Sequence, residues 1–267
     1  MIPSKFQEQV FFTTTRISKP SLDNSTASIG TGFLIDIKLN DEKTSSMTLL
    51  ISNKHVFSNT NEKLEFNFNK KNQDGTVELG NTFTFNSEDF TSLYFEHPDP
   101  NVDLACINVS EINNHQNEVF FMHLYEEMLA DFTEEGLDPG LDVWFVGYPD
   151  NRYDSTNNLP LLRRGYISSI PKVDYNSQKQ FIIDAQVFQG SSGSPVFAPI
   201  GRNYKLIGVV SATMIKHGQL QTIPTLQNGL GVQQILGLGI VVKSTTIIEL
   251  ITEVKRKHFE SLNTTAN

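Results

Sequence analysis

Hydrophobic and polar residues alternate with a period of two along much of the chain. Residues 63–69 give the clearest case, because Leu64, Phe66 and Phe68 stand between polar side chains. Such alternation is typical of a strand with one buried face. Similar short stretches recur with turn signals between them, and they predict a β-rich fold. The other expected strands are residues 10–12, 27–38, 47–52, 82–85, 93–95, 104–109, 141–148, 164–170, 180–187, 195–198, 205–212 and 237–242.

One segment near the end of the chain has the helical period instead. Between Ile247 and Val254, apolar residues recur at intervals of three and four, which predicts a closing helix over residues 245–262. Ser244 or Thr245 can cap its start, and a run of basic residues near its end suits the helix dipole. The pattern therefore places a single long helix after the last strand.

The middle of the chain contains the expected division between two domains. Residues 133–140 are rich in acidic residues, Gly and Pro, which marks a connection. We therefore expect an N-terminal domain over residues 1–135 and a C-terminal domain over residues 136–267. Just before the division, residues 119–131 fit either a strand or a helical turn, and the pattern leaves that choice open.

Composition and charge narrow the class of protein. The chain has 267 residues, of which 38% are hydrophobic and 19 are Phe, so it can bury a large core. A formal net charge of −9 argues against nucleic acid or an anionic membrane as a partner. No run approaches the roughly 18 apolar residues of a membrane span, and the N-terminus has no signal pattern. We expect a soluble protein.

The cysteine count indicates the compartment. Cys106 is the single cysteine and cannot form an internal disulfide, so we expect a reducing, cytoplasmic location. The sequence shows no Cys/His pair at metal-ligand spacing and no glycine pattern for a phosphate or dinucleotide. We therefore expect neither a metal nor a cofactor.

A stretch rich in Gly and Ser is the strongest candidate for chemistry. Residues 189–195 read Gln-Gly-Ser-Ser-Gly-Ser-Pro, which suits a tight turn better than a helix or a central strand. If Ser192 is a nucleophile, its own amide and that of Gly190 would form an oxyanion hole. A surface turn without function is the alternative, because such turns are common.

Two other segments supply a base and an acid. His55 follows the expected strand 47–52, and Asp103 directly precedes the apolar stretch 104–109. A carboxylate at the border of a buried strand needs a partner, and His55 would be that partner. His97 and Asp99 are the local alternatives, although both belong to a turn rich in Pro.

The segments around His55, Asp103 and Ser192, together with Gly30-Thr31-Gly32, resemble the trypsin-like (chymotrypsin-fold) serine proteases. The chain order of His, Asp and Ser is that of chymotrypsin, and the resemblance covers residues 28–250. It is nearest to disulfide-free bacterial members that carry an Asp-Ala dipeptide shortly before the nucleophile, as Asp184 and Ala185 do here. The resemblance implies an all-β fold of two six-stranded antiparallel β-barrels.

The same resemblance implies a serine endopeptidase that cleaves a protein or peptide substrate. His55 would act as general base and then acid, Asp103 would orient it, and Ser192 would form an acyl-enzyme. Ser191 stands where zymogen-activated relatives have an aspartate, so we expect no activation by N-terminal cleavage. Ser194 replaces a glycine that is usual in the family, which is a mild change.

Family geometry also implies a substrate pocket. Its expected lining is Gln186, Val187, Ala212, Thr213 and Gly239. Gln186 stands where trypsins that cut after Lys or Arg keep an aspartate, so we expect small or medium uncharged residues at the cleavage position. Asp184 shares a strand face with Gln186 and is the one carboxylate that could enter the pocket.

Between Thr213 and Gly239 the chain runs for about 25 residues without a clear pattern, which is long for a plain connection. This segment would gate the entry of substrate or bind a regulatory protein partner; a surface excursion without function is the alternative. Two other functions stay open for the whole chain. One is a protease-derived or latent binding module within a larger protein system, and the other is a peptidase whose activity awaits a partner.

Overall fold

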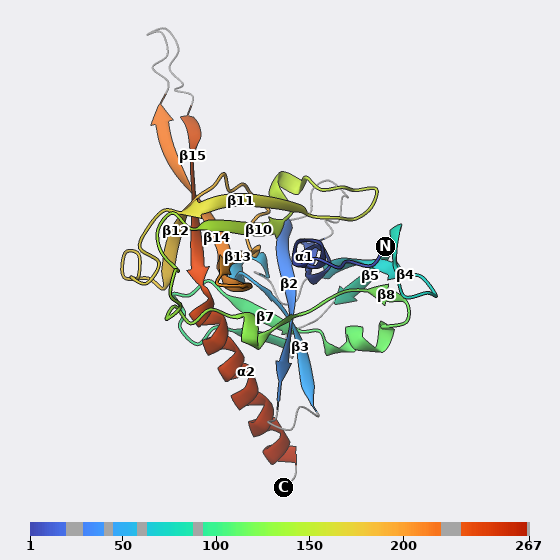
Figure 1. Cartoon of the computed structure of the whole chain (residues 1–267). Helices are drawn as coiled ribbons and strands as arrows, with labels where there is room; N and C mark the ends of the chain where they lie inside the picture. Colours follow the sequence, from blue (N-terminus) through green and yellow to red (C-terminus); the bar gives the residue numbers. More distant parts are fainter. Residues whose placement is uncertain (20–28, 40–44, 58–62, 88–92, 220–230, 266–267) are drawn as a thin grey trace.

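Strands are the main secondary structure of the computed structural model, which describes residues 1–19, 29–39, 45–57, 63–87, 93–219 and 231–265. They form a nine-stranded sheet in the first half of the chain and a closed six-stranded barrel in the second (Figure 1). The long helix α2 (Ser244–Thr265) follows the last strand. The expected all-β class with a C-terminal helix is thus confirmed, and no described helix is long and apolar enough to cross a membrane.

The strands of the first half follow the order β5-β4-β1-β2-β3-β7-β6, with β8 on β4 and β9 on β2. This sheet has nine strands where six were expected. Two of them, β8 and β9, are two-residue strands from the segment that the sequence pattern left open, and β9 is parallel to β2. The elements are α1 (Phe6–Thr13), β1 (Thr14–Ser18), β2 (Ile29–Lys38), β3 (Ser46–Ser52), η1 (Lys54–Val56), β4 (Leu64–Lys71), β5 (Val77–Ser87), β6 (Tyr94–Glu96), β7 (Ala105–Asn108), η3 (Ser110–His115), β8 (Val119–Phe120), β9 (Leu124–Tyr125) and η4 (Glu126–Met128).

The second half is a barrel in which β10 neighbours both β11 and β13, so the sheet closes on itself. All of its strand pairs are antiparallel. Closure leaves the barrel without free edges, except where its strands run on beyond it. The elements are β10 (Asp142–Gly147), η5 (Pro149–Asn151), β11 (Leu161–Ile167), β12 (Gln180–Asp184), β13 (Pro195–Ile200), β14 (Asn203–Gln219) and β15 (Gly231–Lys243).

The expected strand at residues 10–12 is wrong, because these residues belong to helix α1. The carboxylate of Glu8 accepts hydrogen bonds from the backbone N–H groups of Ser4 (2.9 Å) and Lys5 (3.4 Å), which satisfies donors at the helix start. The ring of Phe6 stacks on Tyr204 of the barrel strand β14, with the ring centroids 4.7 Å apart. Three adjacent apolar residues looked like a strand, but end capping and this distant contact favour the helix.

Strands β14 and β15 continue far beyond the barrel as a two-stranded ribbon (Figure 1). Much of the segment 213–239, which showed no pattern in the sequence, therefore pairs as strand; residues 220–230 lie outside the described part. Ile215 and Ile235 oppose each other on this ribbon and are 39% and 41% exposed. A ribbon that packs neither face against a core has no reason to alternate apolar and polar residues.

Two of the three hydrophobic clusters fill the two halves. One lies within the first sheet and includes Leu50 and Phe66. Another lies within the barrel and includes Phe145 and Val241. Each of these four side chains is at most 1% exposed, as expected for the inward faces of sheets that alternate inward and outward residues.

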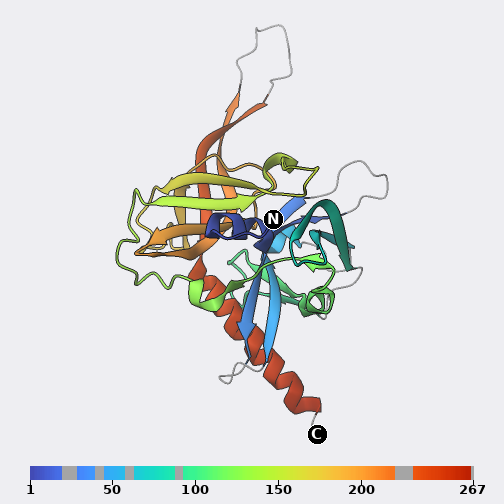
Figure 2. The ribbon, with the colours of Figure 1, turned by 45° about the vertical axis from the view of Figure 1, so that its right-hand side comes forward.

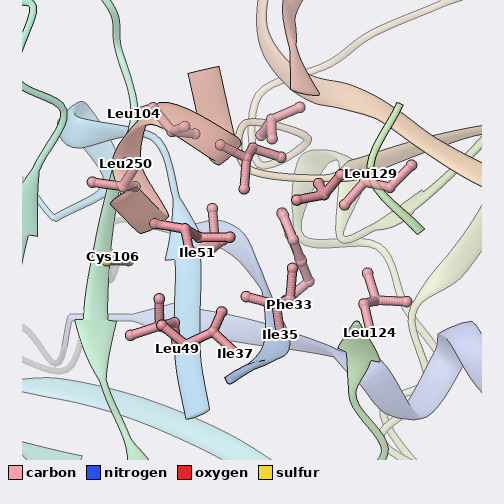
Figure 3. Packing of buried hydrophobic residues seen from close by; sticks show 14 of the residues in the cluster. Phe33, Ile35, Ile37, Leu49, Ile51, Leu104, Cys106, Leu124, Leu129 and Leu250 are labelled. Atoms are coloured by element: carbon pink, nitrogen blue, oxygen red, sulfur yellow. The ribbon is translucent and has the colours of Figure 1, made fainter. Parts of the chain in front are cut away.

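The third cluster joins the two halves and the C-terminal helix. Phe33 of β2 and Ile51 of β3 pack in it with Leu250 of α2 (Figure 3), and Phe197 and Val242 of the barrel complete it. In Figure 2, as in Figure 1, α2 leaves the barrel and runs diagonally past the first sheet. The halves therefore share a continuous core, and this core fixes the position of the segments between them.

Candidate active site

Strand pairing brings His55 and Asp103 together. Ser52, the last residue of β3, lies opposite Ala105, the first residue of β7. His55 lies in the short helix η1 just after β3, and Asp103 lies just before β7, so both leave the same end of the sheet. The side-chain amide of Asn53 donates to the backbone oxygen of Asp103 at 2.7 Å, which fixes the two chain segments against each other.

The carboxylate of Asp103 makes two contacts with His55. Its Oδ2 lies 2.7 Å from Nδ1 of the imidazole, and its Oδ1 accepts a hydrogen bond from the His55 backbone N–H at 3.2 Å. Burial alone would raise the pKa of Asp103, but the hydrogen bonds and the charge of His55, with a bond from Ser211, outweigh it and lower that pKa. An ionised Asp103 favours the tautomer with the proton on Nδ1, which leaves Nε2 free to accept a proton.

Ser211 is a site residue that the sequence did not reveal. Val210 pairs with Val241 and Ala212 pairs with Ile240, so Ser211 is the unpaired residue of a β-bulge in β14. A bulge redirects a side chain from the regular pleat, and here the Ser211 hydroxyl donates to Oδ2 of Asp103 at 2.9 Å. No sequence signal marks this bulge, because it depends on the pairing of β14 with β15.

The turn that carries Ser192 is anchored on the first half of the molecule. The Thr31 backbone N–H donates to the oxygen of Ser192 at 2.8 Å, and the Thr31 hydroxyl donates to the oxygen of Gly190 at 2.8 Å. The backbone N–H of Gly193 in turn donates to the backbone oxygen of Val210 in β14 at 2.8 Å. Thr31 lies in β2, so strand β2 and the barrel strand β14 hold the turn between them.

Gly190 and Gly193 meet two separate demands of this turn. Their φ angles are +84° and +87°, in the left-handed region that favours glycine. A Cβ atom on Gly193 would also collide with the backbone oxygen of Thr31 and the hydroxyl of Ser52. The backbone amides of Gly190 and Ser192 make no hydrogen bond to any described residue, so both are free to bind an oxyanion.

The structure does not join Ser192 to His55. The Ser192 hydroxyl donates instead to the backbone oxygen of Ser211 at 3.0 Å, and no hydrogen bond between Ser192 and His55 occurs in the described part of the chain. Ser211 therefore contacts both the expected acid and the expected nucleophile. A rotation of the Ser192 side chain, which exposed side chains make in picoseconds to nanoseconds, would redirect its hydroxyl.

The five expected pocket residues fall into two groups. Thr213 and Gly239 are cross-strand partners on β14 and β15, and Gly239 packs on the buried side chain of Val187. Gln186 and Ala212 are exposed. The geometry thus brings three of the five into one cluster.

The alternatives to the expected base and acid, His97 and Asp99, contact each other and helix α2. His97 is buried and its Nε2 lies 3.1 Å from Glu249 of α2, while its Nδ1 accepts a hydrogen bond from the backbone of Asp99 at 3.0 Å. Ser194 is buried, and its hydroxyl has no hydrogen-bond partner among the described residues. Among all the residues that the structure describes, no group of three His, Cys, Asp or Glu side chains could hold a metal ion.

Residues 30–209 match the family described as trypsin-like peptidase domain. The matched range includes His55, Asp103 and Ser192, whereas Ser211 lies just beyond its end. Among solved structures, the tobacco vein mottling virus protease aligns over 91% of this chain and 82% of its own, at 14% identity and a TM-score of 0.48. None of the curated proteins matches the chain.

Proposed function

This chain belongs to the trypsin-like peptidase family, and from that premise we propose that it is a serine endopeptidase. His55 is its general base and acid, Asp103 orients His55, and Ser192 is its nucleophile. The observation that carries this assignment is the bond of 2.7 Å between Asp103 and Nδ1 of His55. It leaves the other ring nitrogen able to accept a proton, and Ser211, which bonds to Asp103, also accepts a hydrogen bond from the Ser192 hydroxyl.

The reaction follows from these positions. The Ser192 hydroxyl turns from Ser211 to His55 and attacks the carbonyl carbon of the scissile bond, while its proton passes to Nε2 of His55. The carbonyl oxygen becomes negative and binds the amides of Gly190 and Ser192. His55 then gives the proton to the leaving nitrogen as the C–N bond breaks, and a water molecule hydrolyses the acyl-enzyme in the same way.

The finer properties belong to the same proposal. Ser191, beside the nucleophile, has no carboxylate for an ion pair with a new N-terminus, so the enzyme needs no N-terminal cleavage. Val187, Thr213 and Gly239 line the pocket, which takes small or medium uncharged side chains. The single cysteine, Cys106, is buried, which fits action in the cytoplasm.

A fluorophosphonate probe tests the assignment, because it phosphonylates an activated serine and places its oxygen in the oxyanion hole. We expect the protein to be labelled, Ser192→Ala to lose the label, and Ser168→Ala, at an exposed serine of the same barrel, to keep it. Labelling that survives Ser192→Ala would contradict the proposed nucleophile.

A second candidate function, a latent or protease-derived binding module, is favoured by one observation. Ser192 bonds to the backbone of Ser211 and not to His55. The same probe separates the two functions: no labelling of the unaltered protein, while Ser192→Ala still captures a partner protein with equal affinity, favours the binding module.

A further inference from the structure

Arg163 of β11 occupies an unusual place beneath the nucleophile turn. It pairs across the sheet with Phe145, and its guanidinium carbon lies 5.0 Å from the centroid of that ring. On its other side it lies 5.1 Å from the ring of Phe188. The charged group is thus held between two aromatic faces, an arrangement that the planar guanidinium suits better than the ammonium of a lysine.

No described carboxylate pairs with Arg163. Its neighbour Arg164 behaves in the ordinary way, because its guanidinium bonds to the carboxylate of Asp142 at 2.8 Å on the surface. Arg163 is half-buried, and burial lowers the pKa of its guanidinium without any opposing contribution from an acid. A buried cation without a counter-ion is costly, so its cost must be offset by the contacts it makes.

Those contacts reach both ends of one tight turn. The N–H of Ser191 donates to the oxygen of Phe188 at 3.0 Å, which closes a four-residue turn over residues 188–191. Gly190, at the third position, has a φ of +84°, as a type II turn requires. Arg163 contacts the first residue of this turn through the Phe188 ring, and its Nη1 lies 3.5 Å from the hydroxyl of Ser191, the last residue.

The type of turn decides where the Gly190 amide points. Type I and type II turns differ mainly by a rotation of the peptide unit between the second and third residues, here Gln189 and Gly190. That peptide carries the N–H of Gly190, one of the two proposed oxyanion donors. If the unit rotated to the type I arrangement, this N–H would turn away from the site, and the oxygen of Gln189 would lose the hydrogen bond that it accepts from the Asp150 N–H at 2.6 Å.

We propose that Arg163 is a positioning residue: it holds Phe188 and Ser191, the two ends of the turn, where the oxygen of Gln189 reaches the Asp150 N–H, and so keeps the Gly190 amide directed at the oxyanion. The proposal rests on the proposed serine endopeptidase function. Arg163 itself touches no reacting atom. Its contact with Ser191 fixes the turn in place of an ion pair, which would need a carboxylate at position 191.

Three variants test the role. Arg163→Met keeps an unbranched apolar side chain and removes the guanidinium, Arg163→Lys keeps the charge without the planar group, and Arg164→Met is the matched control. Because a displaced donor costs less than an absent one, we expect kcat of Arg163→Met to fall roughly 10- to 100-fold with KM nearly unchanged. The fluorophosphonate labelling rate should fall in parallel, Arg163→Lys should recover part of both, and Arg164→Met should stay within about twofold.

A second measurement does not depend on catalysis. Amide hydrogen exchange or the ¹⁵N–¹H resonance of Gly190 reports the turn directly, in Ser192→Ala protein as well. We expect the Gly190 amide to change in Arg163→Met and to remain unaltered in Arg164→Met. If kcat and the Gly190 amide are the same in both variants, the proposal is overturned. If the amide responds but no variant or parent protein is labelled, the positioning role stands and the proposed peptidase activity fails.

Discussion

The hydroxyl of Ser211 lies 2.9 Å from Oδ2 of Asp103, the same oxygen that meets Nδ1 of His55 at 2.7 Å. One carboxylate oxygen therefore accepts from His55, the proposed base, and from a bulged residue of the barrel. The bond helps to keep Asp103 ionised and in place.

We accordingly expect Ser211→Ala to lower kcat/KM about tenfold. A hydrogen bond to a charged group contributes about 1.5–3 kcal/mol, and the partial exposure of Asp103 favours the lower end of that range. Steady-state kinetics over a range of pH measure the effect, and the pKa of Asp103 should rise in the variant. Unchanged kinetics would mean that Ser211 does not support Asp103.

Asp103→Asn should have a much larger effect. The carboxamide has an NH₂ group in place of one of the two oxygens, and this group cannot accept, so either the bond from the His55 backbone N–H or the bond from Nδ1 is lost. If its NH₂ group faces Nδ1, the imidazole proton moves to Nε2, which can then no longer accept from Ser192. We expect kcat to fall about 10⁴-fold, with little change in melting temperature. Asp99→Asn, at the rival acid of the Pro-rich turn, is the control and should keep nearly full activity.

Much of the fold follows from sequence, because residues that face one packed core recur with a period of two in a strand and of about 3.6 in a helix. The strand around Phe66 and the helix around Leu250 are such cases. The pattern fails for residues 10–12, where capping by Glu8 and a ring contact with Tyr204 decide in favour of helix, and for the ribbon, where no core imposes alternation.

The candidate site divides in the same way. His55 and Asp103 could be predicted, since each stands at the border of an apolar strand, and the structure places them in contact. Ser211, Thr31 and Arg163 could not, because their roles depend on a bulge, on a contact between the halves and on a cross-strand pair. The division at residues 135 and 136 and the complete set of pocket residues remain predictions.

The buried His97 and the half-buried His123 predict an acid-sensitive fold. Burial lowers the pKa of His97 and of His123, although Glu249 and Asp36 respectively act in the opposite direction. Below the usual value of about 6.5, the unfolded chain then binds more protons than the folded chain, so stability falls as pH falls. The stability that the two neutral histidines allow is fully present above about pH 6.5.

Thermal melting between pH 5 and pH 8 measures this dependence. We expect the melting temperature to fall below about pH 6.5, His97→Gln and His123→Gln each to weaken the dependence, and the double variant to weaken it further. A dependence that is unchanged in the double variant would assign it to other groups.

Gly193→Ala adds two costs to the free energy of folding: backbone strain and a collision of the new Cβ atom. A positive φ costs of order 1–3 kcal/mol in a residue with a Cβ. Here the Cβ also collides with Thr31, and we expect a larger loss of stability together with loss of activity. Gly136→Ala is the matched control, since Gly136 has a φ of +85° and open space around it. Denaturant unfolding compares the two; equal losses would show that the collision is relieved without cost.

Thr31 gives the molecule a mechanical property. Because a strand of one half supports the turn of the other half that carries the proposed nucleophile, any strain that slides the halves apart would release that turn while each half is still folded. Loss of turnover should then precede loss of secondary structure. Activity would therefore report a displacement of the two halves before either half unfolds.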